Sequence, residues 1–298
     1  MNIVELSPGI FHLQGGVNMG LVVRDDQALL VDAGLDEDAA RRALRVVEEA
    51  GVTLAAVFLT HAHADHFGGA HFLQRRLGVP LLAPTLEAAM MENPIIEPLY
   101  LFGGAAPIGE LRGKFTLARP CRVGRVVEPG PLEIGPFRVE VVSLPGHAPN
   151  QAGLAVEDVL FCADALFPEE TLQKHKVTFC VDLDETLATL ARLPALPFAR
   201  FAPGHGPAYA AGDGITRICA ANRERLEAVR QAVSAALTTP QESGALVRCV
   251  ADHFGLQLTT ATAYFLTQTT ILAALSSLER QGRARATVEQ NRLLWQQA

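Results

Sequence analysis

Lysine, tryptophan and long apolar runs are scarce in this chain of 298 residues, which has three lysines and one tryptophan. No apolar run approaches the ~20 residues that a membrane-spanning helix needs. The first residues show no basic stretch followed by an apolar core, so we expect no signal peptide. The five cysteines are scattered and form no Cys-x-x-Cys pair, which indicates reduced thiols rather than a disulfide framework. These absences favour a cytoplasmic protein with no membrane partner.

Basic charge is also in short supply, because the formal net charge is −7. From residue 215 onward nine arginines stand against six acidic residues, an excess of only three positive charges. Nucleic-acid binding draws on a strong basic surface, so we expect a small-molecule substrate, and nucleic acid is disfavoured as a partner. The hydrophobic share of 49% suffices for a large buried core.

A dense group of metal-capable side chains follows the apolar run Ala55–Leu59, which we interpret as a short buried strand. Residues 60–66 read Thr-His-Ala-His-Ala-Asp-His. Active sites of layered α/β folds gather at the carboxyl ends of strands. The alternate spacing lets His61 and His63 reach one ion while Asp65 and His66 reach a second. A surface histidine cluster, as in an affinity tag, is the alternative, but such tags lie at chain termini.

This His-x-His-x-Asp-His motif resembles the signature of the metallo-β-lactamase fold superfamily. Three later segments resemble the rest of that pattern, in the same order. A Leu-Pro-Gly-His turn ends at His147, a predicted strand ends at Asp164, and a Pro-Gly-His turn ends at His205. Each segment alone is weak support, whereas four in this order, each after a predicted strand, are strong support.

The resemblance implies a centre of two divalent metal ions, with zinc as the expected metal and iron or manganese as alternatives. It implies ions ~3.5 Å apart with a bridging hydroxide between them, which Asp65 helps to position as a catalytic residue. Asp32, in an early Asp-x-Gly turn, would support the metal loop without binding metal. The implied ligands are His61, His63 and His147 for one ion, Asp65, His66 and His205 for the other, and Asp164 between them.

The resemblance also implies the fold, a four-layered αββα sandwich of the α/β (α+β) class, which we assign to residues 1–212. Residues 213–298 change composition and predict a second, winged-helix-like domain. We expect helices over Ile215–Leu237 and Thr260–Gln281, a helix opened by a capping box at Thr239–Glu242, and a terminal hairpin over 283–295. The last helix offers Thr, Tyr, Phe and Leu rather than basic residues, so it suits packing on the catalytic domain or on the second subunit of a homodimer.

Residues 85–128 interrupt the alternation of strands and helices with an apolar, turn-rich insertion. It is either a lid or pocket wall, with Tyr100 and Phe102 contacting substrate, or a helical pair packed on the sheet or on another subunit. His175 lies between Lys174 and Lys176. This cluster either contacts an anionic part of the substrate or is a solvated surface feature.

These patterns favour a binuclear metal-dependent hydrolase of a small ester, thioester or lactone, similar to glyoxalase II and its relatives. A mononuclear-iron persulfide dioxygenase, using only His61, His147 and Asp164, is the first alternative, but those relatives lack a winged-helix extension. A metal-dependent nuclease is the second, and it would need a basic channel that the acidic balance does not provide.

Overall fold

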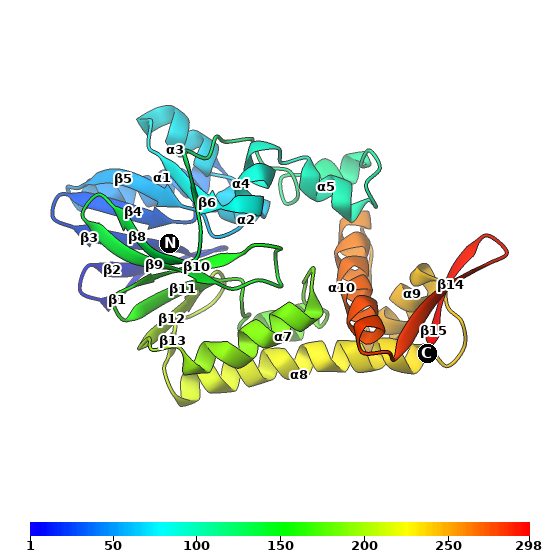
Figure 1. Ribbon diagram of the computed structural model, residues 1–298. Coiled ribbons are helices and arrows are strands. Elements are labelled where there is room, and N and C mark those ends of the chain that lie inside the picture. The colour runs from blue at the N-terminus through cyan, green and yellow to red at the C-terminus, as the bar shows by residue number, and fades with distance from the viewer.

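Two mixed β-sheets form the centre of the computed structural model, which describes residues 1–298 (Figure 1). The first sheet has seven strands in sequence order, and the second has six. In spatial order, the first contains β1 (Asn2–Ser7), β2 (Ile10–Gln14), β3 (Met19–Arg24), β4 (Gln27–Val31), β5 (Thr53–Phe58), β6 (Leu81–Pro84) and β7 (Arg125–Val127); the second contains β13 (Tyr209–Ala210), β12 (Arg200–Pro203), β11 (Val159–Ala163), β10 (Ala152–Val156), β9 (Phe137–Ser143) and β8 (Gly130–Ile134).

Helices flank both sheets. The α-helices are α1 (Glu37–Glu49), α2 (Ala64–Phe67), α3 (Ala70–Leu77), α4 (Thr85–Glu92), α5 (Ile96–Leu101), α6 (Glu169–His175), α7 (Leu183–Arg192), α8 (Asp213–Ala236), α9 (Ser243–Phe254) and α10 (Ala261–Arg280), with 3-10 helices η1 (Gly109–Arg112) and η2 (Leu193–Ala195). None of these helices combines the length and the apolar character that crossing a membrane would require.

Strand direction decides where the loops of interest lie. In the first sheet β1 to β4 form an antiparallel meander, whereas β4, β5, β6 and β7 run parallel. In the second sheet β11 and β12 are the parallel pair. The carboxyl ends of parallel strands meet at one edge of a sheet. The loops after β4 and β5, and those after β11 and β12, therefore each leave from a common edge.

Three hydrophobic clusters show the layers. One lies between the sheets and includes Phe58 from β5 and Phe161 from β11. A second packs the other face of the first sheet against α1 and α3, as Val47 and Leu73 illustrate. The third covers the other face of the second sheet, where α7 and α8 lie (Figure 1). Two mixed sheets with flanking helices are thus confirmed as the fold class.

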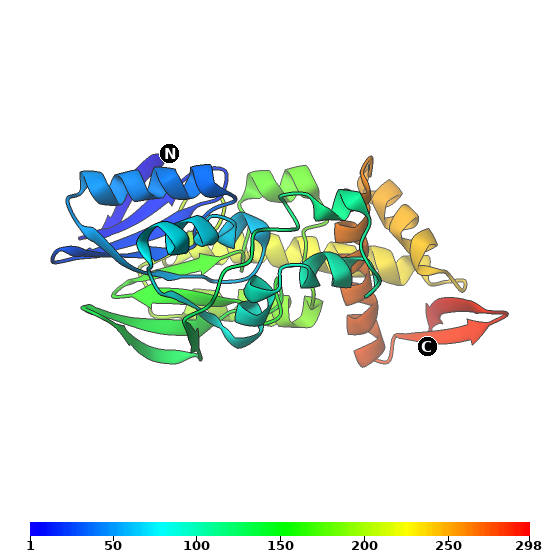
Figure 2. The ribbon, with the colours of Figure 1, turned by 90° about the horizontal axis from the view of Figure 1, so that it is seen from above.

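The C-terminal region consists of α8, α9, α10 and the antiparallel hairpin of β14 (Ala284–Glu289) and β15 (Arg292–Gln297). Figure 2 shows the hairpin at the end of the molecule far from the two sheets. The helices expected at 215–237 and 260–281 and the terminal hairpin are confirmed. The third cluster has 29 buried residues and continues from Leu144, just after β9, to Ala284 in β14. The region therefore shares one core with the second sheet.

One expected helix start is wrong. The helix predicted to open at Thr239–Glu242 begins only at Ser243, with Glu242 as its N-cap. The backbone N–H and C=O of Gln241 instead pair with Trp295 of β15, at N···O distances of 2.9 and 2.8 Å. A tertiary β-bridge thus takes the backbone groups that a first helical turn would have used.

The insertion over residues 85–128 packs against α10 of the same chain. The rings of Phe102 and Phe265 meet edge to face, with centroids 5.3 Å apart. Near η1, the backbone N–H and the hydroxyl of Thr262 both donate to Glu110, at 3.3 and 3.4 Å. In Figure 1, α10 runs between α5 and α8, so it joins the insertion to the helical layer under the second sheet.

Candidate metal centre

Four loops at the strand ends carry the seven side chains that the sequence predicts as metal ligands. The loop after β5 and the start of α2 carry four of them, and the loop between β9 and β10 carries His147. Asp164 follows β11 directly, and His205 follows β12. The structure brings all seven together, although up to 144 positions separate them in the sequence.

The side chains form overlapping groups whose nitrogen and oxygen atoms lie within 4.8 Å of one another. His63 Nδ1 and His147 Nε2 are 2.9 Å apart. His205 Nε2 lies 3.8 Å from Asp65 Oδ2. The groups are His61 with His63 and His147, Asp65 with His66 and His205, and His61 with His66 and Asp164.

Asp164 lies between the first two groups and faces both with its carboxylate. Its Oδ1 is 3.3 Å from His66 Nε2, and its Oδ2 is 3.4 Å from His205 Nε2. The same Oδ2 is 3.6 Å from His147 Nε2. One carboxylate therefore reaches both groups, as a ligand shared between two ions would.

Three buried atoms of this cluster lack a hydrogen bond, which tests whether a metal fits. His61 Nε2, His66 Nε2 and Asp164 Oδ1 make no hydrogen bond. Unsatisfied buried polar atoms are rare and costly, so three at one point fit a site that binds a cation. Gly204 leaves room beside them, since a Cβ there would lie 2.2 Å from Asp164 Oδ1. Imidazole and carboxylate donors fit Zn, Fe or Mn.

Asp32 connects the first sheet to the metal loop. It follows β4 in a left-handed conformation, with φ of 62°. Its carboxylate accepts hydrogen bonds from the backbone N–H of Thr60 at 2.9 Å and from the Thr60 hydroxyl. It also lies 2.8 Å from His66 Nδ1, which leaves Nε2 of that ring facing Asp164. The Thr60 hydroxyl lies 3.0 Å from His61 Nδ1. Asp32 therefore contacts the metal loop at both Thr60 and His66, and its supporting role stays a prediction.

Backbone carbonyls orient His147 and His205, the two histidines outside the loop of residues 60–66. His147 Nδ1 donates to the carbonyl of Phe179 at 3.0 Å, and His205 Nδ1 donates to that of Gly16 at 3.2 Å. A carbonyl only accepts a hydrogen bond, so each contact keeps the ring proton on Nδ1. The lone pair of Nε2 is then available to bind metal. The outer contacts of these two histidines therefore preset the tautomer that binds metal.

Burial and charge divide the histidines into two sets. Burial, followed by the neighbouring imidazoles, lowers the pKa of His61 and His63 well below its usual range, so both rings are neutral donors. Burial also opposes the charged form of His66, but Asp164, Asp65 and Asp32 outweigh it and raise the pKa of that ring. The three carboxylates around the buried His66 ring favour a positive charge at that place.

No pattern in the sequence indicated Glu87, a fully buried carboxyl on α4. Its two oxygens accept from the backbone N–H groups of Ala62 and Asn150, each at 2.8 Å. One side chain thus holds the first metal loop and the loop that follows His147. Burial raises the pKa of Glu87 to about 7, although both hydrogen bonds oppose the rise.

Asn18 and His12 were missed as well, and both contact the loop that carries His205. The Asn18 amide donates to the carbonyls of Pro203 at 3.0 Å and Gly206 at 2.8 Å, on either side of His205. His12 Nε2 lies 3.1 Å from the same Pro203 carbonyl, and burial lowers the pKa of His12 to about 4. These contacts span more than 180 positions, so no local pattern could have indicated them.

The three predicted substrate contacts lie on two elements, with Tyr100 and Phe102 at the end of α5 and His175 at the end of α6. Tyr100 is on α5, and burial followed by the charges of Glu97 and Glu87 raises its pKa. Phe102 packs on α10, as described above. His175 is exposed at the end of α6. Their roles stay predictions.

The fold and the His/Asp centre define a metal-dependent hydrolase. The chain belongs to the metallo-beta-lactamase superfamily, whose family model matches residues 13–205. A probable metallo-hydrolase from Bacillus subtilis, YqgX, is 27% identical over 198 residues, which cover 64% of this chain and 85% of the relative. A hydroxyacylglutathione hydrolase from Xylella fastidiosa strain 9a5c is 31% identical over 188 residues. That match covers 62% of this chain but only 57% of the relative's length.

Two solved structures share the fold over nearly the whole chain. A beta-lactamase domain protein from Burkholderia ambifaria superposes with a TM-score of 0.75 at 21% identity and covers 100% of this chain and 94% of its own. A metallo-beta-lactamase family protein from Thermus thermophilus gives 0.74 at 22% identity, with 99% and 100% covered. Both matches extend through the C-terminal helices and hairpin, beyond the part that the family model matches.

Proposed function

We propose that this protein is a binuclear metal-dependent hydrolase of a small ester, thioester or lactone. The observation that carries the proposal is the position of Asp164, which faces both ligand groups within 3.3 to 3.6 Å. A single-ion centre needs one group of ligands, whereas this chain offers two with a shared carboxylate. The similarity to hydroxyacylglutathione hydrolases, which act on a thioester, supports the substrate class.

Each ligand group would hold one ion, and zinc is the metal we expect. When bound, the two ions supply Lewis acidity, which lowers the pKa of water at the centre toward ~7 and polarises a substrate carbonyl. Asp65 and His205 have side chains 30% and 24% exposed, whereas four of the other ligands are buried, so the site opens on their side. We assign to Asp65 the catalytic task of orienting the attacking water, which its exposed carboxylate can reach.

The mononuclear-iron dioxygenase is less well supported, because four further ligands accompany His61, His147 and Asp164. The nuclease is less well supported because of the net charge of −7 and the setting of α10. We propose a winged-helix-like fold for residues 213–298, in which α10 would be the recognition helix. Its buried residues include Thr267, Thr270 and Ile271, so it packs against protein where a recognition helix would face a DNA groove.

Metal analysis and a substrate panel test the proposal together. We expect about two zinc or manganese ions per chain and hydrolysis of thioesters, lactones or esters. Asp164→Ala should reduce the metal content toward one ion per chain and the rate by at least ~100-fold, because it removes the shared ligand. Wild-type metal content and rate in that variant would refute the binuclear mechanism. One iron per chain with oxygen consumption on a glutathione persulfide would favour the dioxygenase.

Two further proposals concern the state of the protein in the cell. The cytoplasmic location is supported by five free cysteines, four of them buried. The homodimer would be tested by light scattering coupled to size-exclusion chromatography, in which a mass near 64 kDa is expected from a 31.9 kDa chain.

A further inference from the structure

The segment between α6 and α7 lies between the metal centre and the C-terminal helices. Its residue Phe179 accepts the hydrogen bond from His147 Nδ1 through the backbone carbonyl, at 3.0 Å. The Phe179 ring also makes edge contacts with the rings of His63 and His147, with centroids 5.3 and 5.6 Å away. The backbone position of Phe179 therefore sets the direction in which His147 Nε2 points.

A single hydroxyl on α10 holds that backbone on both sides of Phe179. The hydroxyl of Thr270 donates to the carbonyl of Thr178 at 3.1 Å and accepts from the N–H of Cys180 at 3.2 Å. A hydroxyl can do both at once, because it has one hydrogen and two lone pairs. Thr270 is 0% exposed, so water does not compete for either bond.

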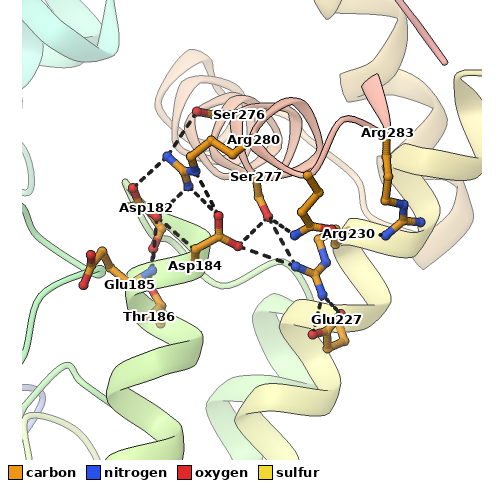
Figure 3. Close-up of polar contacts among 11 residues, drawn as sticks. Asp182, Asp184, Glu185, Thr186, Glu227, Arg230, Ser276, Ser277, Arg280 and Arg283 are labelled. Carbon is orange, nitrogen blue, oxygen red and sulfur yellow. Dashed lines mark hydrogen bonds and ion pairs between the residues drawn. The ribbon is translucent and has the colours of Figure 1, made fainter. Parts of the chain in front are cut away.

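A polar cluster anchors the same segment a few residues further on (Figure 3). Arg280, near the end of α10, lies 3.0 Å from an oxygen of Asp182 and 2.8 Å from one of Asp184. The hydroxyl of Ser277 donates to Asp184 at 2.6 Å. In turn, the backbone N–H of Asp182 donates to the carbonyl of Gly146, the residue before His147, at 3.1 Å. α10 thus holds both the orienting carbonyl and the turn that carries the histidine.

We infer that helix α10 positions the metal ligand His147, with Thr270 as the positioning residue and the Arg280 ion pairs as a second support. The inference depends on the proposed function only in taking His147 as a ligand. The C-terminal region then sets the geometry of one metal ion from outside the ligand set, through hydrogen bonds to the intervening backbone.

The test compares the zinc affinities of three variants of the full chain, each with one threonine replaced. Chelator competition measures the affinity. Thr270→Val keeps the shape and removes both hydrogen bonds, and we expect about 10-fold weaker binding of one of the two ions. Thr270→Ser restores the hydroxyl and should stay within about twofold of the wild-type affinity. Thr269→Val is the matched control, because that hydroxyl bonds only to the Phe265 carbonyl of its own helix.

The thermal midpoint of each metal-free variant separates positioning from stability. We expect Thr269→Val and Thr270→Val both to lower the midpoint, but only Thr270→Val to weaken zinc binding. Equal zinc affinities in these two variants, or no recovery in Thr270→Ser, would overturn the inference. If Thr270→Val does not fold, the zinc affinity of Arg280→Gln decides, because this exposed side chain forms the ion pairs with Asp182 and Asp184. Arg292→Gln, at another exposed arginine, is its control. A few-fold loss of affinity then supports the inference, and wild-type affinity overturns it.

The readout also separates this inference from the proposed activity. A protein that binds two zinc ions but hydrolyses no member of the substrate panel would refute the hydrolase proposal. The affinity difference between Thr270→Val and Thr269→Val would still be measurable in that protein, and it would still support the positioning role.

Discussion

Replacing Glu87 by glutamine removes a titrating group from beneath the metal loops. Burial raises the pKa of Glu87 from 4.5 to about 7 in the folded protein, which corresponds to ~3 kcal/mol. Burial penalises the ionised carboxylate only in the folded state, so the folded pKa of Glu87 lies above the unfolded one. The protonated carboxyl therefore leaves the folded state at full stability below pH 4.5, and ~3 kcal/mol of that stability is lost as the pH rises through 7. Glu87 alone should therefore lower the free energy of unfolding by ~2.5 kcal/mol between pH 5 and pH 8.

Urea unfolding of the metal-free wild type and Glu87→Gln, at several values of pH from 5 to 8, measures this effect. The free energy of unfolding of the variant minus that of the wild type should increase by ~2.5 kcal/mol from pH 5 to pH 8, because glutamine does not titrate. Titrating groups that do not interact with Glu87 cancel in the difference. The charge of Glu87 also raises the pKa of Glu97, and loss of that repulsion in the variant changes the difference in the same direction. Glu49→Gln, at an exposed position at the end of α1, is the control and should give a flat difference. A flat difference for Glu87→Gln would refute the claim that burial keeps this carboxyl protonated.

Three further outcomes are expected. Gly204→Ala should lower metal content and reduce activity by at least ~10-fold, because the new methyl group would lie 2.2 Å from Asp164; Gly109→Ala, with open space around it, should leave both unchanged. Asp32→Asn should weaken zinc binding by about 10- to 100-fold in chelator competition, whereas an unchanged affinity would show that the carboxylate does not orient the loop. Deleting residues 213–298 should yield aggregated protein on size-exclusion chromatography, because the shared core would be exposed, and a monodisperse metal-binding fragment would contradict this.

The loops that carry the candidate ligands could be identified from the sequence because their signals are local. Each consists of a few residues at the end of a strand, as in the Pro-Gly-His turn that ends at His205. The two sheets follow from short apolar runs such as Val159–Ala163, which becomes a fully buried strand. Asp32 could also be identified from the sequence, because its Asp-x-Gly turn directly follows the apolar strand β4.

The supporting residues could not be predicted, because their partners are distant in the sequence. Glu87 contacts backbone groups 25 and 63 positions away, and Asn18 contacts groups 185 and 188 positions away. Before the fold is known, a glutamate on a short helix is indistinguishable from a solvated one. The helix start expected at Thr239 failed for the same reason, since the pairing of Gln241 with Trp295 spans 54 positions.

The setting of insertion 85–128 was open between a pocket wall and a packing element. Its contacts with α10 at Phe102 and Glu110 show it packed on a helix of its own chain. The prediction for the insertion named only the sheet or another subunit, although the prediction for α10 included packing on the catalytic domain. Apolar periodicity indicates that a surface is buried, but it does not name the surface that buries it.

The core that Leu144 shares with Ala284 has a consequence for synthesis on the ribosome. The first sheet consists of residues 2–127 and can form early, whereas the outer face of the second sheet stays uncovered until α8 and α10 have been made. Thr270 follows His147 by 123 positions, so the backbone that orients His147 is secured only after α10 has been made. Metal uptake at that ligand should therefore follow the synthesis of α10, and a nascent chain stalled before α8 would expose apolar strands that chaperones bind.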